Sequence, residues 1–192
     1  MQAGRASTIE LLGEERILRR GGFPAREAEI MARAREHGFP VPLVHEVRPD
    51  ALVMDRVAGP TMGEHLAHRP WLAGRQMRVL ADLHRRLHAI PFEDAVLVHY
   101  DLHPLNVLLS PAGPVVIDWT NARAGEADAD VALTWLILST SAGWRGRLLA
   151  RLFARAAGRD PIRRGLPAAR EFRLADHHVT DAERARIRAL AD

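Results

Sequence analysis

Apolar and polar positions alternate along the first 57 residues of the chain. Residues 8–12 (TIELL) and 16–20 (RILRR) read as short strands joined by the loop GEE, which contains the glycine that a tight hairpin favours. Residues 43–57 read as a second hairpin around the turn RPD. Between the hairpins, Pro24 near the start and Gly38 just past the end bound a helix of about 13 residues. The pattern therefore predicts the order β-β-α-β-β.

Beyond this region the apolar positions take helical spacing. Thr61 and Glu64 form a capping box, which predicts the start of a short helix. The next helix ends before Pro91 and carries leucines three and four residues apart, Leu80, Leu83 and Leu87. His84 and His88 lie on the same amphipathic helix, and we expect them to be partly exposed structural residues.

The segment 96–118 interrupts the helices with a third hairpin, in which NVLLS and PVVID flank the loop PAG. If Ser110 pairs with Pro114, the antiparallel register sets Asn106 directly opposite Asp118. The Cβ atoms of two such residues lie roughly 4.5–5.5 Å apart. The sequence therefore predicts that an amide and a carboxylate meet at the open end of this hairpin.

One amide oxygen and one carboxylate at that distance can share Mg²⁺, which takes one or two protein oxygens and completes its shell with water and phosphates. Asp101 lies five residues before Asn106 and can accept a proton from a substrate hydroxyl beside that ion. An aspartate, an asparagine five residues later and a strand-borne aspartate form the layout used for phosphoryl transfer. A zinc or hydrolase cluster built on His99 and His103 is the alternative, but no further pair of ligands follows in a pattern.

The stretch HYDLHPLNVLL…VVIDW resembles the aminoglycoside phosphotransferase/choline kinase-like family, whose members are relatives of protein kinases. The family signature is H-x-D-L-H-P-x-N, followed by I-D-W or I-D-F. The resemblance implies a two-lobed, protein-kinase-like α+β fold in which both lobes are smaller than is usual for the family. The shortened β-rich N-lobe would span residues 1–57, and the reduced helical C-lobe residues 58–192, including the catalytic hairpin 96–118.

The same resemblance implies roles for the residues of this segment. Asp101 would be the catalytic base, and His99 would orient the loop that carries it. His103 would touch the transferred phosphate. Asn106 and Asp118 would be the Mg²⁺ ligands. Asp130 matches the aspartate at a helix start that braces the catalytic loop in the family.

In the N-lobe the resemblance implies a set of contacts to ATP, at Ser7, Ile17, Arg19, Glu27, Met54, Asp55 and Val57. Arg19 stands where the family has a lysine against the α- and β-phosphates, and Glu27 would be its helix partner. Ile17 would line the adenine pocket and Met54 its back wall. Backbone groups of Asp55 and Val57 would bind adenine, and Ser7, in the short GRAST segment, would contact phosphate.

Two of these assignments stay open at the level of sequence. Arg20 competes with Arg19 for the phosphate contact, because periodicity does not separate adjacent arginines on a short strand. Glu29 competes with Glu27 for the partner role. Arginine is also not interchangeable with lysine at a phosphate, because its planar fork replaces a point charge.

We therefore expect an ATP- and Mg²⁺-dependent phosphotransferase that acts on the hydroxyl of a small molecule. A nucleotide-binding pseudokinase or scaffold with little turnover is the alternative, because GRAST retains a single glycine and the acceptor region after residue 119 is short. A protein kinase is not favoured, since the segment between the IDW motif and Asp130 is too short for an activation loop.

Composition limits the partners and the cell compartment that we expect for this protein. All 27 basic residues are arginines, and the net charge is only +3 despite a pI near 10.7, so a nucleic-acid partner is not favoured. The chain has no cysteine, no apolar run of spanning length and no apolar leader, which fits a cytoplasmic enzyme without a membrane partner. Whether a homodimer completes the phosphate loop by pairing at residues 8–12 is left open.

Overall fold

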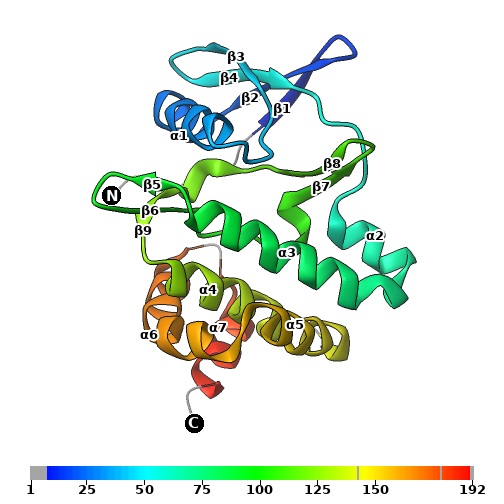
Figure 1. The fold of residues 1–192 in the computed structure, drawn as a ribbon, viewed down its shortest axis with the longest axis vertical. Helices are drawn as coiled ribbons and strands as arrows, with labels where there is room; N and C mark the ends of the chain where they lie inside the picture. Colours follow the sequence, from blue (N-terminus) through cyan, green and yellow to red (C-terminus); the bar gives the residue numbers. More distant parts are fainter. Residues whose placement is uncertain (1–7, 142, 178, 191–192) are drawn as a thin grey trace.

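The structure is a computed structural model that describes residues 8–141, 143–177 and 179–190 (Figure 1). Its smaller lobe is an antiparallel sheet of four strands in the order β1-β2-β4-β3. The strands are β1 (Thr8–Leu12), β2 (Arg16–Arg20), β3 (Val44–Val47) and β4 (Ala51–Asp55). Helix α1 (Pro24–Glu36) lies between the two hairpins in sequence and packs against the sheet. The predicted order β-β-α-β-β is confirmed.

Helix α1 forms where the sequence signals place it. Pro24 occupies the first turn, where its missing N–H costs nothing, and the chain leaves the helix through Gly38 with φ +70°. The helix buries Ile30, Met31 and Ala34 in the core. This packing presents Glu27, near the helix start, to the inner face of the sheet.

The larger lobe is mostly helical. Its helices are α2 (Met62–His68), α3 (Ala73–His88), α4 (Ala127–Thr140), α5 (Gly143–Ala157), α6 (Arg159–Ala175) and α7 (Asp181–Ala189), with short 3₁₀ turns at Pro70–Leu72, Pro104–Asn106 and Trp119–Asn121. The strands β5 (Pro91–Phe92), β6 (Ala95–Val98) and β9 (Arg123–Gly125) form a small sheet beside α3 and α4. The α+β, two-lobed fold expected from the sequence is thus confirmed. The boundary expected between residues 57 and 58 stays a prediction.

The predicted helix signals in this lobe are also present. Thr61 Oγ1 accepts a hydrogen bond from the Glu64 N–H at 3.1 Å, and the Glu64 carboxylate accepts one from the Thr61 N–H at 2.8 Å. The leucines of α3 point into the core and are at most 1% exposed, Leu80, Leu83 and Leu87.

Helix α4 lies at the centre of the helical lobe, in contact with α3, α5, α6 and α7 (Figure 1). Helix α6 packs against the first turn of α4 at Gly165, where an added Cβ would lie 2.0 Å from the Asp128 carbonyl oxygen. Close packing at this point fixes the position of Asp130, in the same first turn of α4.

The hairpin of β7 (Val107–Ser110) and β8 (Gly113–Val116) differs from the prediction by one residue. Ser110 pairs with Gly113 and not with Pro114. Gly113 adopts φ +128°, which favours glycine, and the Ser110 hydroxyl donates to its carbonyl at 2.8 Å. The loop therefore shrinks to Pro111 and Ala112.

The shifted register moves the two expected metal ligands out of direct opposition. Asn106 faces Ile117, whose N–H donates to the Asn106 carbonyl at 3.0 Å. Asp118 follows one residue later with φ 62°, in the left-handed region. The expectation that Asn106 and Asp118 lie directly opposite each other is wrong.

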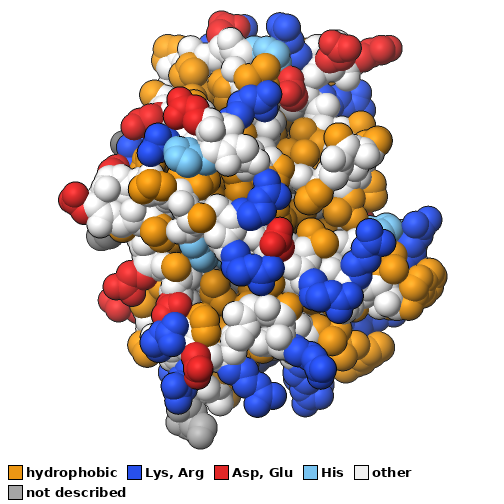
Figure 2. All heavy atoms as spheres, in the orientation of Figure 1, with side chains coloured by type: hydrophobic (Ala, Val, Ile, Leu, Met, Phe, Trp, Pro, Cys, Tyr) orange, Lys and Arg blue, Asp and Glu red, His pale blue; other side chains and the backbone are white. Residues whose placement is uncertain are grey.

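Strand β1 is an edge of the four-stranded sheet, and Ile9 and Leu11 on it are exposed. Pairing of a second copy at this edge stays a prediction. On the face in Figure 2, arginine side chains are separated by apolar and acidic ones. Within the described part of the chain, no helix combines the length and the hydrophobicity needed to cross a membrane.

Candidate active site

The loop between β6 and β7, residues 99–106 (hereafter loop 99–106), carries the side chains expected to do chemistry. His99 at its start is fully buried and edge-on to Trp119, with ring centroids 5.0 Å apart. Burial lowers the pKa of His99, so the ring is neutral, and its Nε2–H donates to the Ile117 carbonyl at 3.2 Å. His99 thus ties the loop to the end of the β7–β8 hairpin.

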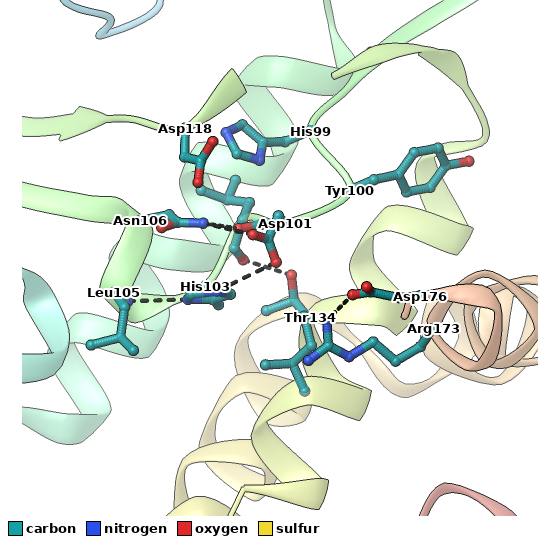
Figure 3. A network of polar contacts seen from close by, with 12 residues as sticks. His99, Tyr100, Asp101, His103, Leu105, Asn106, Asp118, Thr134, Arg173 and Asp176 are labelled. Atoms are coloured by element: carbon teal, nitrogen blue, oxygen red, sulfur yellow. Dashed lines mark hydrogen bonds and ion pairs between the residues drawn. The ribbon is translucent and has the colours of Figure 1, made fainter. Parts of the chain in front are cut away.

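Asp101 lies at the centre of a polar network (Figure 3). Asn106 Nδ2 donates to the Asp101 carboxylate at 3.0 Å and to its backbone carbonyl at 2.9 Å. His103 Nε2 lies 3.4 Å from the other carboxylate oxygen, and its Nδ1 accepts from the Leu105 N–H. His103 therefore contacts Asp101 directly.

The electrostatics around Asp101 keep it ionised. Burial alone would raise the pKa of Asp101, but the hydrogen bond and charge of His103, with the charge of Arg173, lower it below its ordinary value. The side chain remains 23% exposed. An ionised, accessible carboxylate is the form that can accept a proton from a hydroxyl.

Asn106 and Asp118 offer oxygens that suit a hard divalent cation. The Asn106 amide nitrogen donates both of its hydrogen bonds to Asp101. The Asn106 Oδ1 atom is therefore left for a ligand. Asp118 Oδ1 accepts from Thr120 Oγ1 at 2.8 Å and from Arg19 at 3.3 Å, so Oδ2 is the oxygen left for a metal. An amide oxygen and a carboxylate oxygen fit Mg²⁺.

A cleft of ≈ 340 Å³ lies between the two lobes and meets this network. Its lining includes these residues expected to contact ATP or Mg²⁺: Ile17, Arg19, Glu27, Met54, Asp55, Val57, Asn106 and Asp118. Ile17 and Met54 are register partners on β2 and β4. The Asp55 N–H already donates to Leu43, so a base could use only its carbonyl. Ser7 lies outside the described residues.

The buried ion pair on the cleft wall separates the alternatives left open by the sequence. Arg19 NH1 lies 2.6 Å from Glu27 Oε2, and the residues are 7% and 2% exposed. Burial raises the pKa of Glu27 although the charge of Arg19 opposes the shift. Arg20 instead pairs with Asp50, and Glu29 pairs with Arg26, both on the surface. Arg19 and Glu27 are the pair that faces the cleft.

Asp130 supports the loop from the opposite side. Its carboxylate accepts from the His99 N–H at 3.1 Å and the Tyr100 N–H at 2.8 Å, and it is fully buried. Burial alone would raise the pKa of Asp130, but the hydrogen bonds that its carboxylate accepts, that of His88 among them, hold it well below its ordinary value. This is the bracing contact implied by the sequence resemblance.

The expected partial exposure of His84 is wrong, because α4 packs over this face of α3 and leaves the residue 1% exposed. Sequence reasoning also missed Thr120, which links Arg19 to Asp118, and Thr134, which donates to the Leu102 carbonyl at 2.7 Å. Arg173 of α6 is a further omission; its charge acts on Asp101 across the lobe. No local pattern marks these residues, since their partners lie far away in the chain or belong to a non-repeating turn.

Comparison with known proteins adds family information. The RIO domain matches residues 23–134, more than half of the chain. A probable serine/threonine-protein kinase, a BUD32 homologue of Archaeoglobus fulgidus, is 31% identical over 112 residues. The aligned region covers 58% of this chain and 50% of the relative, so the chain spans about half the length of the curated relative it matches.

Solved structures show the same fold at low identity. A choline/ethanolamine kinase family protein from Mesorhizobium loti has a TM-score of 0.65 at 18% identity, with 99% of this chain and 86% of that one covered. The gentamicin complex of the aminoglycoside phosphotransferase APH(2")-IIa has a TM-score of 0.65 at 13% identity, with 90% and 80% covered. Ethanolamine kinase of Plasmodium vivax has a TM-score of 0.61 at 10% identity, with 97% and 82% covered.

These findings correct the expected family and acceptor. The resemblance to aminoglycoside phosphotransferases and choline kinases holds for the fold, whereas the sequence match is to the RIO domain. The expected small-molecule hydroxylated acceptor is wrong, because the relative is named as a serine/threonine-protein kinase.

Proposed function

This chain belongs to the RIO domain family, and from that premise we propose that it is a kinase-type phosphotransferase that uses ATP and Mg²⁺ to phosphorylate a serine or threonine hydroxyl of a protein. The observation that carries the proposal is the meeting of Asp101, Asn106 and Asp118 at the edge of a cleft whose wall holds the Arg19–Glu27 pair.

Each of these side chains has a distinct role in the proposal. Asp101 accepts the proton of the acceptor hydroxyl as the hydroxyl oxygen bonds to the γ-phosphorus and ADP leaves. Arg19, held by Glu27, neutralises phosphate charge. Asn106 Oδ1 and Asp118 Oδ2 would hold Mg²⁺, which when bound neutralises charge on the phosphates. Such a site works by positioning and electrostatics.

Ile17, Met54 and the backbone at Asp55 and Val57 hold adenine in this proposal. They line the cleft between the lobes. Adenine is flat and apolar on its faces, so burial between such side chains favours binding. His103 keeps Asp101 oriented and ionised through its contact with the carboxylate.

A protein acceptor suits the surroundings of Asp101. Its carboxylate is partly exposed and does not line the cleft proposed for the nucleotide. Leu105, in the same loop 99–106, is 57% exposed. An extended peptide can therefore bring a hydroxyl to Asp101 across an open surface.

A phosphorylation assay tests the proposal. The purified chain is incubated with Mg²⁺ and γ-labelled ATP, alone and with dephosphorylated casein or histone, and phosphoserine and phosphothreonine are mapped by mass spectrometry. We expect labelled hydroxyl residues and a Mg²⁺-dependent rise in Tm with ATP. Asp118→Asn is expected to lose both signals.

Asp82→Asn is the matched control, because Asp82 is an exposed aspartate on α3 that pairs only with Arg85 among the described residues. It is expected to behave as the unsubstituted chain does. Transfer that is unchanged by Asp118→Asn would contradict the assigned metal ligand. Labelling of no serine or threonine would contradict the proposed activity.

One observation favours a second candidate, a nucleotide-binding protein with little turnover. The Arg19 guanidinium lies 3.3 Å from Asp118 Oδ1, so a positive charge already stands beside the proposed metal ligand. The assay above separates the two functions. A Mg²⁺-dependent rise in Tm with ATP, without phosphate transfer to any protein, is expected for the second candidate only.

A further inference from the structure

Behind loop 99–106, on the side away from the cleft, two histidines of α3 meet an aspartate of α4. His88 Nε2 lies 2.9 Å from Asp130 Oδ2, and His84 Nδ1 lies 3.6 Å from the same oxygen. All three ligand atoms lie within 4.8 Å of one another. A cavity of ≈ 320 Å³ on the surface between α3 and α4 is lined by both histidines. None of these imidazoles takes part in the proposed phosphotransfer.

The hydrogen bonds of His84 fix which of its ring nitrogens carries the proton. The Thr134 hydroxyl has one hydrogen, which it donates to the Leu102 carbonyl at 2.7 Å. Thr134 Oγ1 must therefore accept from His84 Nε2–H, 3.0 Å away. In the neutral ring, Nδ1 is then a bare lone pair.

The lone pair of His84 Nδ1 is buried and lies near a second hydrogen-bond acceptor, Asp130 Oδ2. His84 Nδ1 has no hydrogen-bond partner within the described part of the chain, although the residue is 1% exposed. Its neighbour Asp130 Oδ2, at 3.6 Å, is too far for a hydrogen bond and also accepts. An unsatisfied buried acceptor of this kind is costly, and a cation would satisfy both atoms.

The separations suit a small tetrahedral ion. Nitrogen and oxygen ligands at the usual zinc bond lengths lie roughly 3.3 Å apart in a tetrahedron. The separations from Asp130 Oδ2 to His88 Nε2, 2.9 Å, and to His84 Nδ1, 3.6 Å, bracket that value. His88 is partly exposed toward the cavity, so its ring proton can move from Nε2 to Nδ1 through solvent as the metal binds. The cavity also leaves room for a water in the fourth position.

Two imidazoles and one carboxylate favour a transition metal over Mg²⁺, which prefers oxygen ligands alone. We propose that His84 Nδ1, His88 Nε2 and Asp130 Oδ2 form a zinc-class site that fastens loop 99–106 from behind. Asp130 holds the His99 and Tyr100 amides, and His84 holds Leu102 through Thr134. Partners of this kind orient ligands in metal sites. The site is structural and stands independently of the proposed kinase activity.

Cobalt titration tests the site. The full chain without a histidine tag is stripped with chelator and titrated with Co²⁺ in excess Mg²⁺, which occupies the oxygen-rich site at Asn106 and Asp118. We expect one equivalent of Co²⁺ with the intense visible absorption of four-coordinate cobalt, displaced by Zn²⁺. We also expect Zn²⁺, but not Mg²⁺, to raise the Tm of the stripped chain.

Three variants locate the binding. His88→Ala is expected to weaken Co²⁺ binding by more than about 100-fold, since loss of an outer partner alone costs about 10–100-fold. Thr134→Val keeps all three ligands and the side-chain shape, and is expected to weaken binding about 10–100-fold. His37→Ala, at an exposed histidine after α1, is the control and should bind as the unsubstituted chain does.

His88→Ala is preferred to a change at His84, because His88 is less buried and its loss disturbs packing less. Circular dichroism confirms that each variant is folded before titration. Weak binding without saturation, an octahedral spectrum, or an affinity unchanged by His88→Ala would each overturn the proposal.

Discussion

On the side of loop 99–106 that faces the cleft, the Asp101 and Asp118 side chains are 23% and 43% exposed. On the opposite side, Asp130 and His84 are at most 1% exposed and Thr134 is 1% exposed. Both sides are made of similar polar residues. The two sides differ in whether water can solvate a polar side chain once its hydrogen-bond partner has been removed.

This difference separates catalysis from stability. A partly exposed carboxylate that loses a partner is solvated again, so its removal costs little folding free energy. A buried carboxylate has no such replacement, and removing one member of a buried cluster leaves uncompensated polar groups. We therefore expect substitutions facing the cleft to change activity, and substitutions behind the loop to change stability.

The largest expected effect is that of Asp101→Ala on activity. A general base contributes about 10²–10⁴-fold, and phosphate transfer should fall by that factor. The free energy of unfolding should change by less than about 1 kcal/mol, because Asn106 keeps its bond to the Asp101 backbone carbonyl. Steady-state transfer and urea unfolding measure the two quantities. Full turnover in this variant would remove Asp101 from the mechanism.

Asp130→Ala should show the opposite balance. It removes the acceptor of two backbone amides and of His88, and we expect a loss of about 3–5 kcal/mol in the free energy of unfolding. Asp128→Ala is the control two residues earlier in the same turn, where a partly exposed ion pair with Arg164 should cost about 1 kcal/mol or less. Urea unfolding compares them. Equal losses would show that burial does not separate the two sides.

Arg19 tests whether burial or position decides the effect of a substitution, because it faces the cleft and is nonetheless buried. Arg19→Met leaves the Glu27 carboxyl without its partner, and we expect a loss of about 2–3 kcal/mol in the free energy of unfolding. The double change Arg19→Met with Glu27→Leu should regain most of this loss, since an apolar pair can replace a buried ion pair. Binding of ATP, measured by calorimetry, should stay weakened in both variants. Recovery of ATP binding in the double variant would refute the phosphate role of Arg19.

The smallest expected effect sets the scale for the others. Thr61→Ala removes the cap of α2, away from both sides of the loop, and should cost about 1 kcal/mol. Thr61→Ser keeps the hydroxyl and serves as the control. Unfolding by urea gives both values, and a loss above that of Asp130→Ala would mean that α2 supports the loop more strongly than its cap indicates.

Much of the architecture could be predicted from the sequence, because the signals are local. The helix that begins at Pro24 and the capping box of Thr61 depend on residues within one turn of each other. Spacing within HYDLHPLN also placed Asp101 and Asn106 in one loop, where they are hydrogen-bonded. The register of the next hairpin was missed by one residue, because a positive φ at Gly113 shortened the loop.

Other features had no local signal. His84 and Thr134 lie 50 residues apart, and Thr120 meets Arg19 across 101 residues. The expected class of acceptor was also wrong, because the length of the segment between Trp119 and Asp130 does not determine which kind of molecule supplies the hydroxyl. Family membership, and not periodicity, corrected that error.

The sequence by itself determined the strands and helices, the caps and the composition of loop 99–106, since these depend on neighbours along the chain. Only the tertiary structure decided that Arg19 and not Arg20 faces the cleft, and that His84 loses its contact with water. Both outcomes follow from how α1 and α4 pack. Burial makes the partner of each polar group obligatory, and those partners come from distant parts of the chain.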